Sequence, residues 1–426
     1  MKFHYQIFLA MILGGIAGAF TGEHTKILGV PILASYDLIG TLFINALKMV
    51  VVPLITTAII SGLMNVGKGR DLGRMGLKTL LYYMGTSLVA ILVGLVVVNL
   101  ITPGVIDGQP ARALLGLAAD TSETLASIEG RGAGEFTLIL LKMLPPNLVE
   151  AAAEGQMLGL IVFSLLFGFF LRTLPGAPGE ALRNTIEGIY QVVLSIVMLI
   201  IRFAPLGVFG LIAATVTRTG LDAIEPLALF FITVLLALGL HMFGTMMLLI
   251  KVFARRSPIR HLQAMTPALL TAFSSASSAA TLPLTMECLE TRSGVSKRTS
   301  SFVLPLGATV NMDGTALYEC VAAIFIAQAY GLELSLTTQF IIVFTALVTS
   351  IGVAAISVAS LVAITVILGV IGLPAEALGL ILVTDRVLDM CRTATNVWSD
   401  SVCAVLLARS EGEENVLLQP SSEPGR

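Results

Sequence analysis

The sequence predicts an all-α polytopic membrane protein with eight transmembrane helices and two re-entrant hairpins. The chain has 426 residues, of which 56% are hydrophobic and only 12% are charged, whereas ordinary globular domains carry about 25% charged residues. A soluble domain of this length could not bury so much apolar surface in one core. Long apolar segments recur along the chain, and polar breaks in two of them indicate hairpins that enter the membrane and turn back.

Eight segments are predicted to cross the bilayer, near residues 5–21, 36–65, 76–103, 157–174, 187–216, 226–253, 299–330 and 376–408. The first would also fit a signal peptide, but the many later spans favour a transmembrane helix. The stretches 262–290 and 338–372 each have two arms of about 12–15 residues around a break, and such arms are too short to cross alone. They are the predicted hairpins.

Basic residues predict the orientation. They cluster after the second span, after the sixth span and after the first hairpin: Lys68, Arg70, Arg74 and Lys78; Lys251, Arg255, Arg256 and Arg260; Arg292, Lys297 and Arg298. The positive-inside rule places these clusters and both termini in the cytoplasm. The hairpins then enter from opposite sides, the stretch 104–155 lies mostly outside, and the polar tail 410–426 is expected to be disordered. A span–hairpin–span unit at 226–330 and again at 331–408 indicates inverted repeats.

The last predicted span carries a polar stripe that a lipid-facing helix would not tolerate. Asp385, Asp389, Arg392, Asn396 and Asp400 follow one another at spacings of 4, 3, 4 and 4 residues, which places them within an arc of roughly 80° on one helix face. Each charge at the bilayer centre costs about 2.5–3.5 kcal/mol. The stripe therefore faces protein, water or a charged ligand, and it indicates a protein that handles ions or charged solutes.

A helix break lies inside the seventh span, at 311–315 (NMDGT). Freed carbonyls and the Asp313 carboxylate are hard oxygen ligands of the kind that suit a sodium ion. The alternative is a packed kink, although an unpaired buried carboxylate would be costly there. Tyr83, Thr86 and Ser87 share one face of the third span. Their hydroxyls either complete a cation site with Asp313 or make helix–helix hydrogen bonds.

Two further features have two interpretations each. The tip of the first hairpin, 274–281, is rich in serine and alanine, which lets backbone N–H groups approach a carboxylate or lets helices pack closely. Glu319 lies two turns beyond the break in an apolar helix. It either binds and releases a proton, or it reaches water or pairs with an arginine.

Composition and spacing exclude several functions. A net charge of −2 gives no electrostatic support for nucleic-acid binding. The four cysteines lack metal-ligand spacing and are interpreted as small core residues. The histidines are scattered and receive no role: His4, His24, His241 and His261.

The motifs of the last two spans, PLGATVNMDGTALYE and DRVLDMCRTATNVWSD, resemble those of the glutamate transporter family, the dicarboxylate/amino acid:cation symporters. NALKMVVVPLI, EAAAEGQMLGLIVFSLLFG and RFAPLGVFGLIAATV in spans two, four and five are similar to the same family, as are SSAATLPLT and TSIG in the hairpins. The resemblance implies a homotrimer with an elevator mechanism. A scaffold (about 1–75 and 104–216) would hold a mobile transport domain (about 76–103 and 226–409).

The resemblance also implies substrate-binding residues. Arg392 would pair with the substrate side-chain carboxylate, assisted by Thr315, because a planar guanidinium binds a carboxylate through two hydrogen bonds. Asp389 would take the substrate ammonium group. The α-carboxylate would be held by Asn396, Ser278 and the backbone of both hairpin tips. The remaining implied contacts are Ser277, Thr393 and Ile356.

Three sodium sites are implied in the same way. The first would use Asp400 with the carbonyls of Gly307, Asn311 and Asn396. The second would use Tyr83, Thr86, Ser87, Asn311 and Asp313. The third would use carbonyls at Thr309, Ser350 and Ile351. Glu319 matches the position at which proton-coupled members carry a glutamate.

The sequence departs from the family pattern at the tip of the second hairpin and near Arg392. Ala355 and Ser357 stand where a glycine and a proline are typical, and Val353 lacks a hydroxyl. Losing glycine restricts the backbone there, which bears on the third sodium site. The other departures are Ala276 and Met390, where members often carry a second arginine, and the bulky Trp398, expected to crowd one wall of the site.

We therefore expect a secondary active symporter of L-aspartate or L-glutamate, coupled to sodium with or without a proton. It would not be an enzyme, would need no cofactor besides its coupling ions, and would sit in a prokaryotic inner membrane among lipids. A proton-driven symporter of glutamate or C4-dicarboxylates is one alternative. A neutral amino acid carrier is another, although Arg392 would then be costly to bury. An intramembrane aspartyl protease would need a facing pair of aspartates, and a passive anion channel would not drive flux against a gradient.

Overall fold

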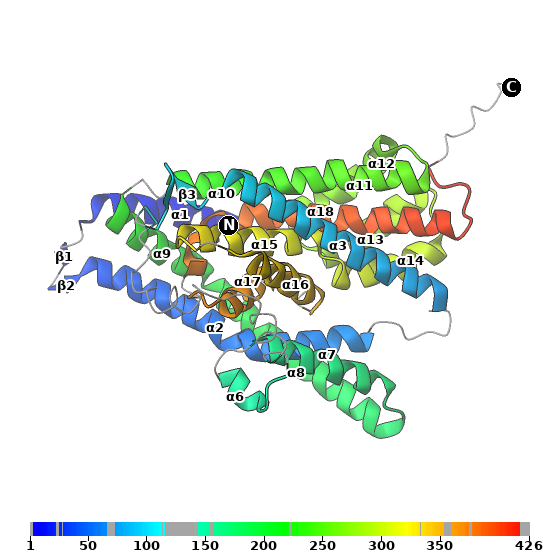
Figure 1. The fold of residues 1–426 in the computed structure, drawn as a ribbon, viewed down its shortest axis with the longest axis horizontal. Helices are drawn as coiled ribbons and strands as arrows, with labels where there is room; N and C mark the ends of the chain where they lie inside the picture. The colour runs from blue at the N-terminus through cyan, green and yellow to red at the C-terminus, as the bar shows by residue number, and fades with distance from the viewer. Residues whose placement is uncertain are drawn as a thin grey trace.

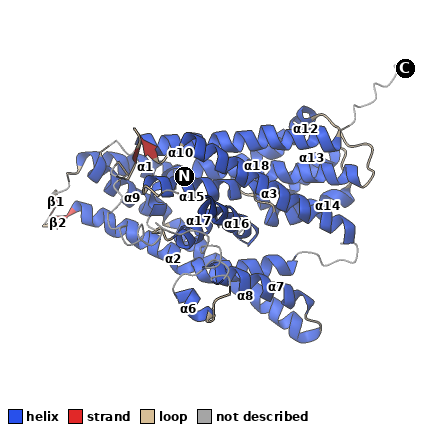
Figure 2. Ribbon diagram, viewed as in Figure 1, coloured by secondary structure: helices blue, strands red, loops and turns tan. Residues whose placement is uncertain are grey.

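A computed structural model describes residues 3–22, 25–27, 29–65, 73–112, 114–115, 141, 144–153, 157–220, 224–332, 334–352, 359–374 and 377–417. The chain forms an elongated bundle of helices, with two short antiparallel ribbons in the described part (Figures 1 and 2). The elements up to the middle of the chain are α1 (Phe3–Phe20), β1 (Lys26–Ile27), β2 (Val30–Pro31), α2 (Ile32–Asn65), α3 (Gly73–Ile101), β3 (Val105–Ile106), β4 (Gln109–Pro110), α6 (Leu148–Ala153), α7 (Met157–Thr173), α8 (Gly176–Arg202) and α9 (Ala204–Thr219).

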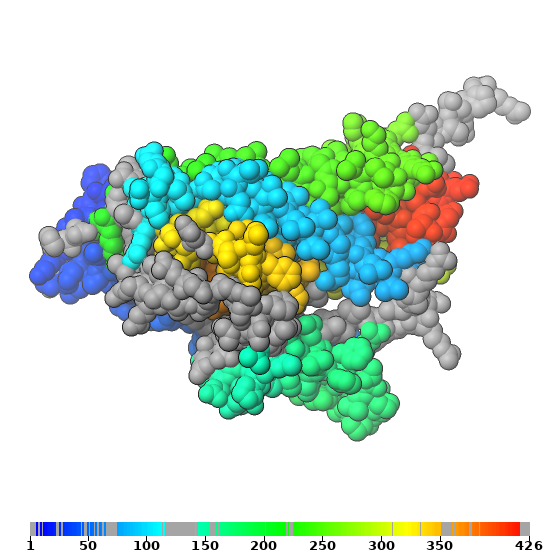
Figure 3. Space-filling model, in the orientation of Figure 1, coloured from blue at the N-terminus to red at the C-terminus, as the bar shows by residue number. Residues whose placement is uncertain are grey.

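The second half contains two π-helical segments and the helices that surround the polar stripe. Its elements are α10 (Ile224–Gly239), η2 (Leu240–Thr245), α11 (Met246–Leu249), η3 (Ile250–Ala254), α12 (Pro258–Ser275), α13 (Ser278–Thr291), α14 (Lys297–Val310), α15 (Asp313–Ala329), α16 (Leu336–Gly352), α17 (Ala359–Ile371) and α18 (Leu378–Ser410). The space-filling view shows α3 as a continuous strip across the visible face (Figure 3).

The helices form two packing groups. Helices α1, α2, α7, α8 and α9 pack mainly on one another, with α2 against α7, α8 and α9. The second group is α3 together with the helices from α10 to α18, in which α15 lies at the centre against α3, α16, α17 and α18. The groups meet where α16 and α17 contact α2 and α7, and where α18 contacts α9. In α15, all residues except Thr315 and Gln328 are buried, as expected for a helix that is apolar all round.

The sequence explains where several helices begin and end. Ser257, Ser277 and Ser296 each stand before a helix and accept a hydrogen bond from a backbone N–H of its first turn, which satisfies an otherwise free donor. Between α12 and α13, Ala276 adopts a left-handed conformation with φ of 50°. This break produces the first predicted hairpin, whose two arms pack on each other.

The remaining breaks agree with the sequence in part. Asn311 and Met312 separate α14 from α15 at the predicted position. Helices α16 and α17 pack on each other as the arms of the second predicted hairpin, but the tip that carries Val353, Ala355, Ile356 and Ser357 lies outside the described residues.

The segment predicted as the fifth span, 187–216, is divided between two helices. The structure has two helices here, α8 and α9, and α8 begins at Gly176, well before residue 187. Phe203 lies between them, and Pro205 occupies the first turn of α9. Proline suits a first turn but not a helix interior because it has no N–H and its ring clashes with the preceding turn. The chain therefore starts a new helix there.

By length and apolar composition, four helical segments of the described chain can cross a bilayer: Met75–Ile101, Gly176–Ile200, Glu225–Ala254 and Lys297–Ala329. Shorter apolar helices accompany them at Ile32–Phe43, Val52–Ser61, Val162–Thr173, Ala204–Arg218 and Leu336–Ser350. The 33-residue helix α18 is long enough, but it carries the polar stripe. The expected number of eight spans stays a prediction.

The described part of the tail after α18, up to residue 417, packs on the helical body, contrary to the expectation of disorder. Val416 and Leu417 are buried. Arg256 donates hydrogen bonds to the carbonyls of Val416 and Glu414, at 2.7 and 2.9 Å. Apolar side chains in an otherwise polar tail therefore give it a docking site on the helical body.

Glu413 ties this tail to the first turn of α14. Its carboxylate accepts hydrogen bonds from the Ser296 backbone N–H at 2.8 Å and from the Ser296 and Thr299 hydroxyls at 2.6 Å. Partial burial raises the pKa of Glu413, but the hydrogen bonds from Ser296 and Thr299 outweigh it and hold the pKa below its usual value. A negative charge is also favoured at a helix N-terminus.

Candidate functional site

The buried polar groups gather where the break between α14 and α15 faces α18, α3 and the π-helical segment η2. Asp313, Asn311 and Asp400 are buried here within the second packing group. The geometry brings together residues from the predicted third, sixth, seventh and eighth spans.

Asp313 is the centre of a cluster of oxygen atoms. Its Oδ1 accepts hydrogen bonds from Ser87 Oγ at 2.7 Å and Thr86 Oγ1 at 3.3 Å. Its Oδ2 accepts one from Ser399 Oγ at 2.7 Å and lies 3.1 Å from His241 Nε2. Asp313 is therefore not the backbone-bonded kink residue of the alternative interpretation. Hydroxyls can rotate to present lone pairs instead of protons, so this cluster can offer hard oxygen ligands to a sodium ion.

A π-helical segment brings His241 to Asp313. In η2, the N–H of Met246 bonds to the carbonyl of His241, five residues back. Such segments are frequent at functional sites. The carbonyl of Met242 accepts a hydrogen bond from the Trp398 indole at 3.0 Å. The ring of Trp398 also packs 4.9 Å from the ring of His261.

Asn311 connects Asp313 to Asp400. Its side-chain N–H₂ donates to Ser399 Oγ and to Asp400 Oδ1, both at 2.9 Å, and its Oδ1 lies 3.5 Å from Thr86 Oγ1. A Cβ at Gly307 would lie 2.4 Å from Asp400 Oδ1. Only glycine therefore allows the backbone of α14 this close to the carboxylate.

The structure changes the role expected of Tyr83. Its hydroxyl donates to the carbonyl of Val303 at 2.9 Å and lies near Gly307, on the Asp400 side. The carbonyl of Tyr83, in contrast, is 3.3 Å from Thr86 Oγ1. Its carbonyl rather than its hydroxyl is the Tyr83 oxygen on the Asp313 side, because the phenol extends away from its own backbone.

Arg392 is buried at the centre of the stripe and bonded to three side chains. Its Nη2 lies 3.1 Å from Asp385 Oδ1 and 3.1 Å from Asp389 Oδ1, and its Nη1 donates to Ser360 Oγ at 3.0 Å. The guanidinium lies 4.0 Å from the ring centroid of Tyr318, a cation–π contact that stabilises a buried cation. Its Nε has no partner within the described part of the chain.

Arg386 supplies a second guanidinium that the sequence analysis did not single out. Its Nη1 lies 3.2 Å from Asp389 Oδ2, so Asp389 is held between two arginines. Arg386 lies one turn before Met390 in α18.

Asn396 joins α18 to the start of α15. Its Oδ1 accepts the backbone N–H of Gly314 at 2.8 Å, and its Nδ2 donates to Thr315 Oγ1 at 3.2 Å. A Cβ at Gly314 would lie 2.7 Å from the carbonyl oxygen of Arg392. Thr393 is buried and donates to the carbonyl of Asp389 at 2.8 Å, so its hydroxyl is used within α18.

Glu319 is fully buried in α15 and does not reach water. Its Oε2 accepts a hydrogen bond from Thr349 Oγ1 of α16 at 3.0 Å, and its Oε1 has no partner among the described residues. It is not paired with an arginine within salt-bridge distance in that part of the chain.

The other predicted residues are placed as follows. Ser277 and Ser278 stand at the first hairpin, where Ser277 Oγ accepts the N–H of Ala280 at 3.2 Å. Ser350 is buried near the end of α16, and its Oγ donates to the carbonyl of Leu347. The side chains of Thr309 and Ile351, and Ile356 as a whole, lie outside the described residues.

Five contacts of this site were missed by sequence reasoning: His241, Tyr318, Thr349, Ser360 and Ser399. Ser399 could have been predicted from the sequence, because it follows Asn396 by three residues and so lies on the same helix face. His241 also had a signal, since an ionisable residue inside a membrane span is a functional candidate by default. Ser360 and Thr349 carry no such signal because hydroxyls are common in helices.

Buried charges on long apolar helices that break at the membrane centre are features of transporters among helical membrane proteins. Residues 3–410 match the family described as the sodium:dicarboxylate symporter family, and the chain belongs to that family. The resemblance read from the motifs is thereby confirmed.

Named relatives cover almost the whole chain. A "Proton/glutamate-aspartate symporter" of Escherichia coli (strain K12) is 34% identical over 418 residues, 96% of this chain and 92% of the relative. A "Proton/sodium-glutamate symport protein" of Bacillus subtilis (strain 168) is 34% identical over 412 residues, 96% and 93%. The human "Excitatory amino acid transporter 3" is 31% identical over 464 residues, 97% and 86%.

Proposed function

We propose that this protein is a secondary active symporter of acidic amino acids, driven by sodium, protons or both. The observation that carries the proposal is the buried Arg392, held 3.1 Å from Asp385 and Asp389 on the same helix as the Asp400 end of the oxygen cluster. The names of the relatives support the same substrates and ions.

The geometry supports an exchange of partners at Arg392. A substrate side-chain carboxylate would compete with Asp385 and Asp389 for the guanidinium, and Arg392 can bind it through two parallel hydrogen bonds. Asp389, once released from Arg392, would offer its carboxylate to the substrate ammonium group. Asn396 and Thr315 would bind the polar groups of the substrate, while Tyr318 would keep the guanidinium in place.

Charge balance gives a reason for cation coupling. Among the described residues, Arg392 is the buried arginine, while the buried acidic side chains are Glu319 and four aspartates, Asp313, Asp385, Asp389 and Asp400. An acidic amino acid would add further negative charge, which a low-dielectric interior disfavours strongly. Cations that enter with the substrate remove this penalty, so flux of the anion becomes tied to flux of sodium or protons.

Asn311 provides a physical link between ions and substrate. It bonds to Asp400 and approaches Thr86 of the Asp313 cluster, and the chain continues from it through Gly314 to the Asn396 contact. Ions bound on either side of Asn311 would order this break before the substrate binds, which is a coupling free energy between two sites.

The division into a scaffold and a mobile transport domain belongs to the same proposal. The two packing groups support it, because each group packs mainly on itself. The homotrimer, the elevator movement, the inner-membrane location and the cytoplasmic termini complete the proposal, the last on the positions of the basic clusters.

Uptake by purified protein in liposomes tests the function. Labelled L-aspartate should accumulate against its gradient when an inward sodium gradient, an inward proton gradient or both are imposed, and should not accumulate without one. If a sodium gradient alone is sufficient for accumulation, the result favours the Asp313 and Asp400 clusters as the sites of ion coupling. If a proton gradient alone is sufficient, the result favours the proton-driven alternative. Equilibration without accumulation would contradict symport, and unlabelled malate or serine as competitor would identify the other substrate classes.

Glu319 is proposed as the proton-coupling residue, and its replacement tests this assignment. Glu319→Gln keeps the shape and the hydrogen bond from Thr349 but cannot lose or gain a proton. Uptake driven by a proton gradient alone should fall by about 10²-fold or more, the scale on which a positioned proton donor or acceptor contributes to a rate, while sodium-driven uptake persists. The control is Glu187→Gln in α8. Proton-driven uptake that is unchanged in Glu319→Gln would move the proton to another carboxylate.

A further inference from the structure

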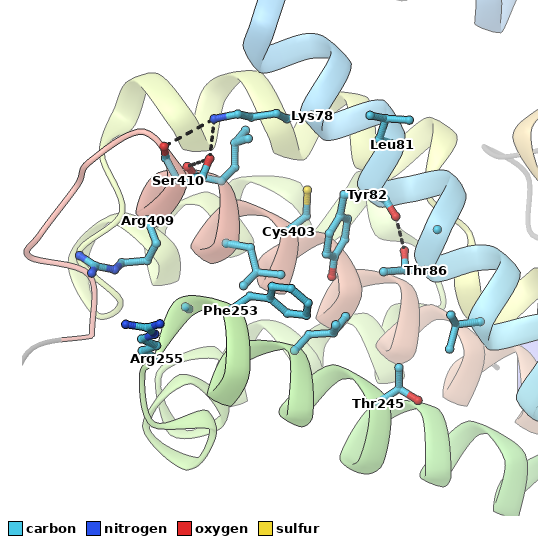
Figure 4. A pocket seen from close by; sticks show the side chains of 16 residues that line it. Lys78, Leu81, Tyr82, Thr86, Thr245, Phe253, Arg255, Cys403, Arg409 and Ser410 are labelled. Atoms are coloured by element: carbon cyan, nitrogen blue, oxygen red, sulfur yellow. Dashed lines mark hydrogen bonds between the residues drawn. The ribbon is translucent and has the colours of Figure 1, made fainter.

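A cavity of about 810 Å³ lies outside the polar site, between α3, the η2–η3 region and α18. Figure 4 shows side chains from all three elements pointing into it. Its middle is apolar, and two of its large side chains, Leu81 and Phe253, have exposed fractions of 63% and 70%. Apolar groups this exposed are costly in water, so the wall suits hydrocarbon.

One end of the cavity is cationic. Lys78, Arg255 and Arg409 line it where α3 begins and where η3 and α18 end (Figure 4). Lys78 pairs with Glu411 at 2.5 Å. Arg255 and Arg409 have no carboxylate within salt-bridge distance in the described chain, and none of the described lining residues is acidic.

Arg409 also leaves hydrogen-bonding capacity at this end. Its Nη1 donates to the carbonyl of Glu413 at 2.9 Å, but its Nε is buried without a partner in the part of the chain that the structure describes. An anionic group between Arg255 and Arg409 would balance the charges of the two guanidinium groups.

We propose that this cavity binds an anionic phospholipid. Its phosphate lies among Lys78, Arg255 and Arg409, and an acyl chain follows the apolar wall past Leu81 and Phe253. A basic pocket at the end of an apolar groove between membrane helices is the arrangement that complements such a lipid, since headgroup charge and chain are recognised together. The inference requires the chain to span a membrane but does not depend on what it transports.

The lipid would also contact the back of the cation cluster. Tyr82 and Thr86 line the cavity, and Thr86 Oγ1 is 3.3 Å from Asp313 Oδ1. An acyl chain in the cavity would press on this turn of α3 and exclude water from the outer side of Thr86.

Native mass spectrometry of the detergent-purified full chain tests the site. The protein is titrated with phosphatidylglycerol or with phosphatidylcholine of the same acyl chains. Phosphatidylglycerol should bind about 25-fold more tightly, because Arg255 and Arg409 each contribute on the order of a fivefold factor near an anionic headgroup, while Lys78 is already paired with Glu411. Equal binding of the two lipids would overturn the proposal, and so would competition by millimolar glycerol phosphate alone, which would indicate an anion site.

Variants separate the two halves of the site. The double variant Arg255→Gln/Arg409→Gln should lose the preference for phosphatidylglycerol, while Arg292→Gln, which removes an exposed basic residue outside the cavity, should retain it.

A side chain added at Gly85 meets open space, so Gly85→Leu should fold normally and fill the cavity. It should weaken binding of both lipids, whereas Gly188→Leu in α8, also facing open space, should not. Unchanged lipid binding in Gly85→Leu would place the lipid elsewhere, whatever the outcome of the transport assays.

Discussion

Replacing Arg392 by alanine is expected to abolish uptake of acidic amino acids while the protein still inserts and binds sodium. The guanidinium is the buried cation of the stripe, 3.1 Å from both Asp385 and Asp389. Its loss removes the partner proposed for the substrate carboxylate and leaves two carboxylates without their cation. Removing one partner of a buried, hydrogen-bonded charge pair costs about 2–5 kcal/mol of binding free energy, which corresponds to a loss of roughly 30- to 4,000-fold in affinity. Uptake of labelled L-aspartate at several substrate concentrations measures this loss of affinity.

The chain offers a matched control on the same helix. Arg386 also contacts Asp389, but its side chain is 20% exposed whereas that of Arg392 is 1% exposed. Arg386→Ala should therefore reduce uptake only modestly. Arg392→Lys keeps the charge but not the planar fork, and it should restore little transport. Stabilisation by sodium in a thermal melt distinguishes lost substrate binding from unfolding. Normal uptake by Arg392→Ala would show that the substrate carboxylate binds elsewhere.

Asp313→Asn is expected to raise the sodium concentration for half-maximal uptake by about 10²-fold or more. The carboxylate is the formal negative charge among the hydroxyls of Thr86, Ser87 and Ser399. Two unit charges about 4 Å apart attract by on the order of 4 kcal/mol at an effective dielectric constant of about 20. An asparagine keeps the size and one acceptor oxygen but removes this attraction. Sodium titration of aspartate uptake measures the shift.

Asp37→Asn is the control for loss of one carboxylate. Asp37 pairs with Arg218 in the other packing group, and both side chains are nearly 40% exposed. An exposed pair contributes about 0–1 kcal/mol, so the sodium dependence should not move. If Asp313→Asn shows the same sodium dependence as the unchanged protein, the Asp313 cluster is not a sodium site. If the sodium concentration for half-maximal uptake shifts in Asp400→Asn instead, sodium coupling would be assigned to the Asp400 site, on the other side of Asn311.

The polar stripe on α18 shows how much of the site can be predicted from helix periodicity alone. Spacings of 4, 3, 4 and 4 residues place Asp385, Asp389, Arg392, Asn396 and Asp400 on one face, and in the structure Arg392 contacts both Asp385 and Asp389. The break at 311–315 is present as predicted, since Asn311 and Met312 leave the helical conformation. Both features are local: helix geometry and the cost of charge in an apolar environment determine them.

Contacts between distant segments were not accessible in the same way. Nothing near His241 in the chain indicates that a π-helical segment turns it toward Asp313, 72 residues away. The hydroxyl of Tyr83 was expected beside Asp313, yet the packing of α3 against α14 gives it to Val303. The tail after α18 looks polar, but Val416 and Leu417 find buried positions.

The sequence by itself thus determined the membrane class, the order of most helices, the break before Asp313 and the face on which the charges of α18 lie. Each follows from hydropathy, helix periodicity or backbone chemistry within about one helix length. Only the tertiary structure decided which groups meet: Asp313 with Ser399 and His241, Asn311 with Asp400, and Arg392 with Tyr318 and Ser360. Such pairings depend on how helices cross and rotate against one another, and that is set by the packing of many side chains together rather than by any single motif.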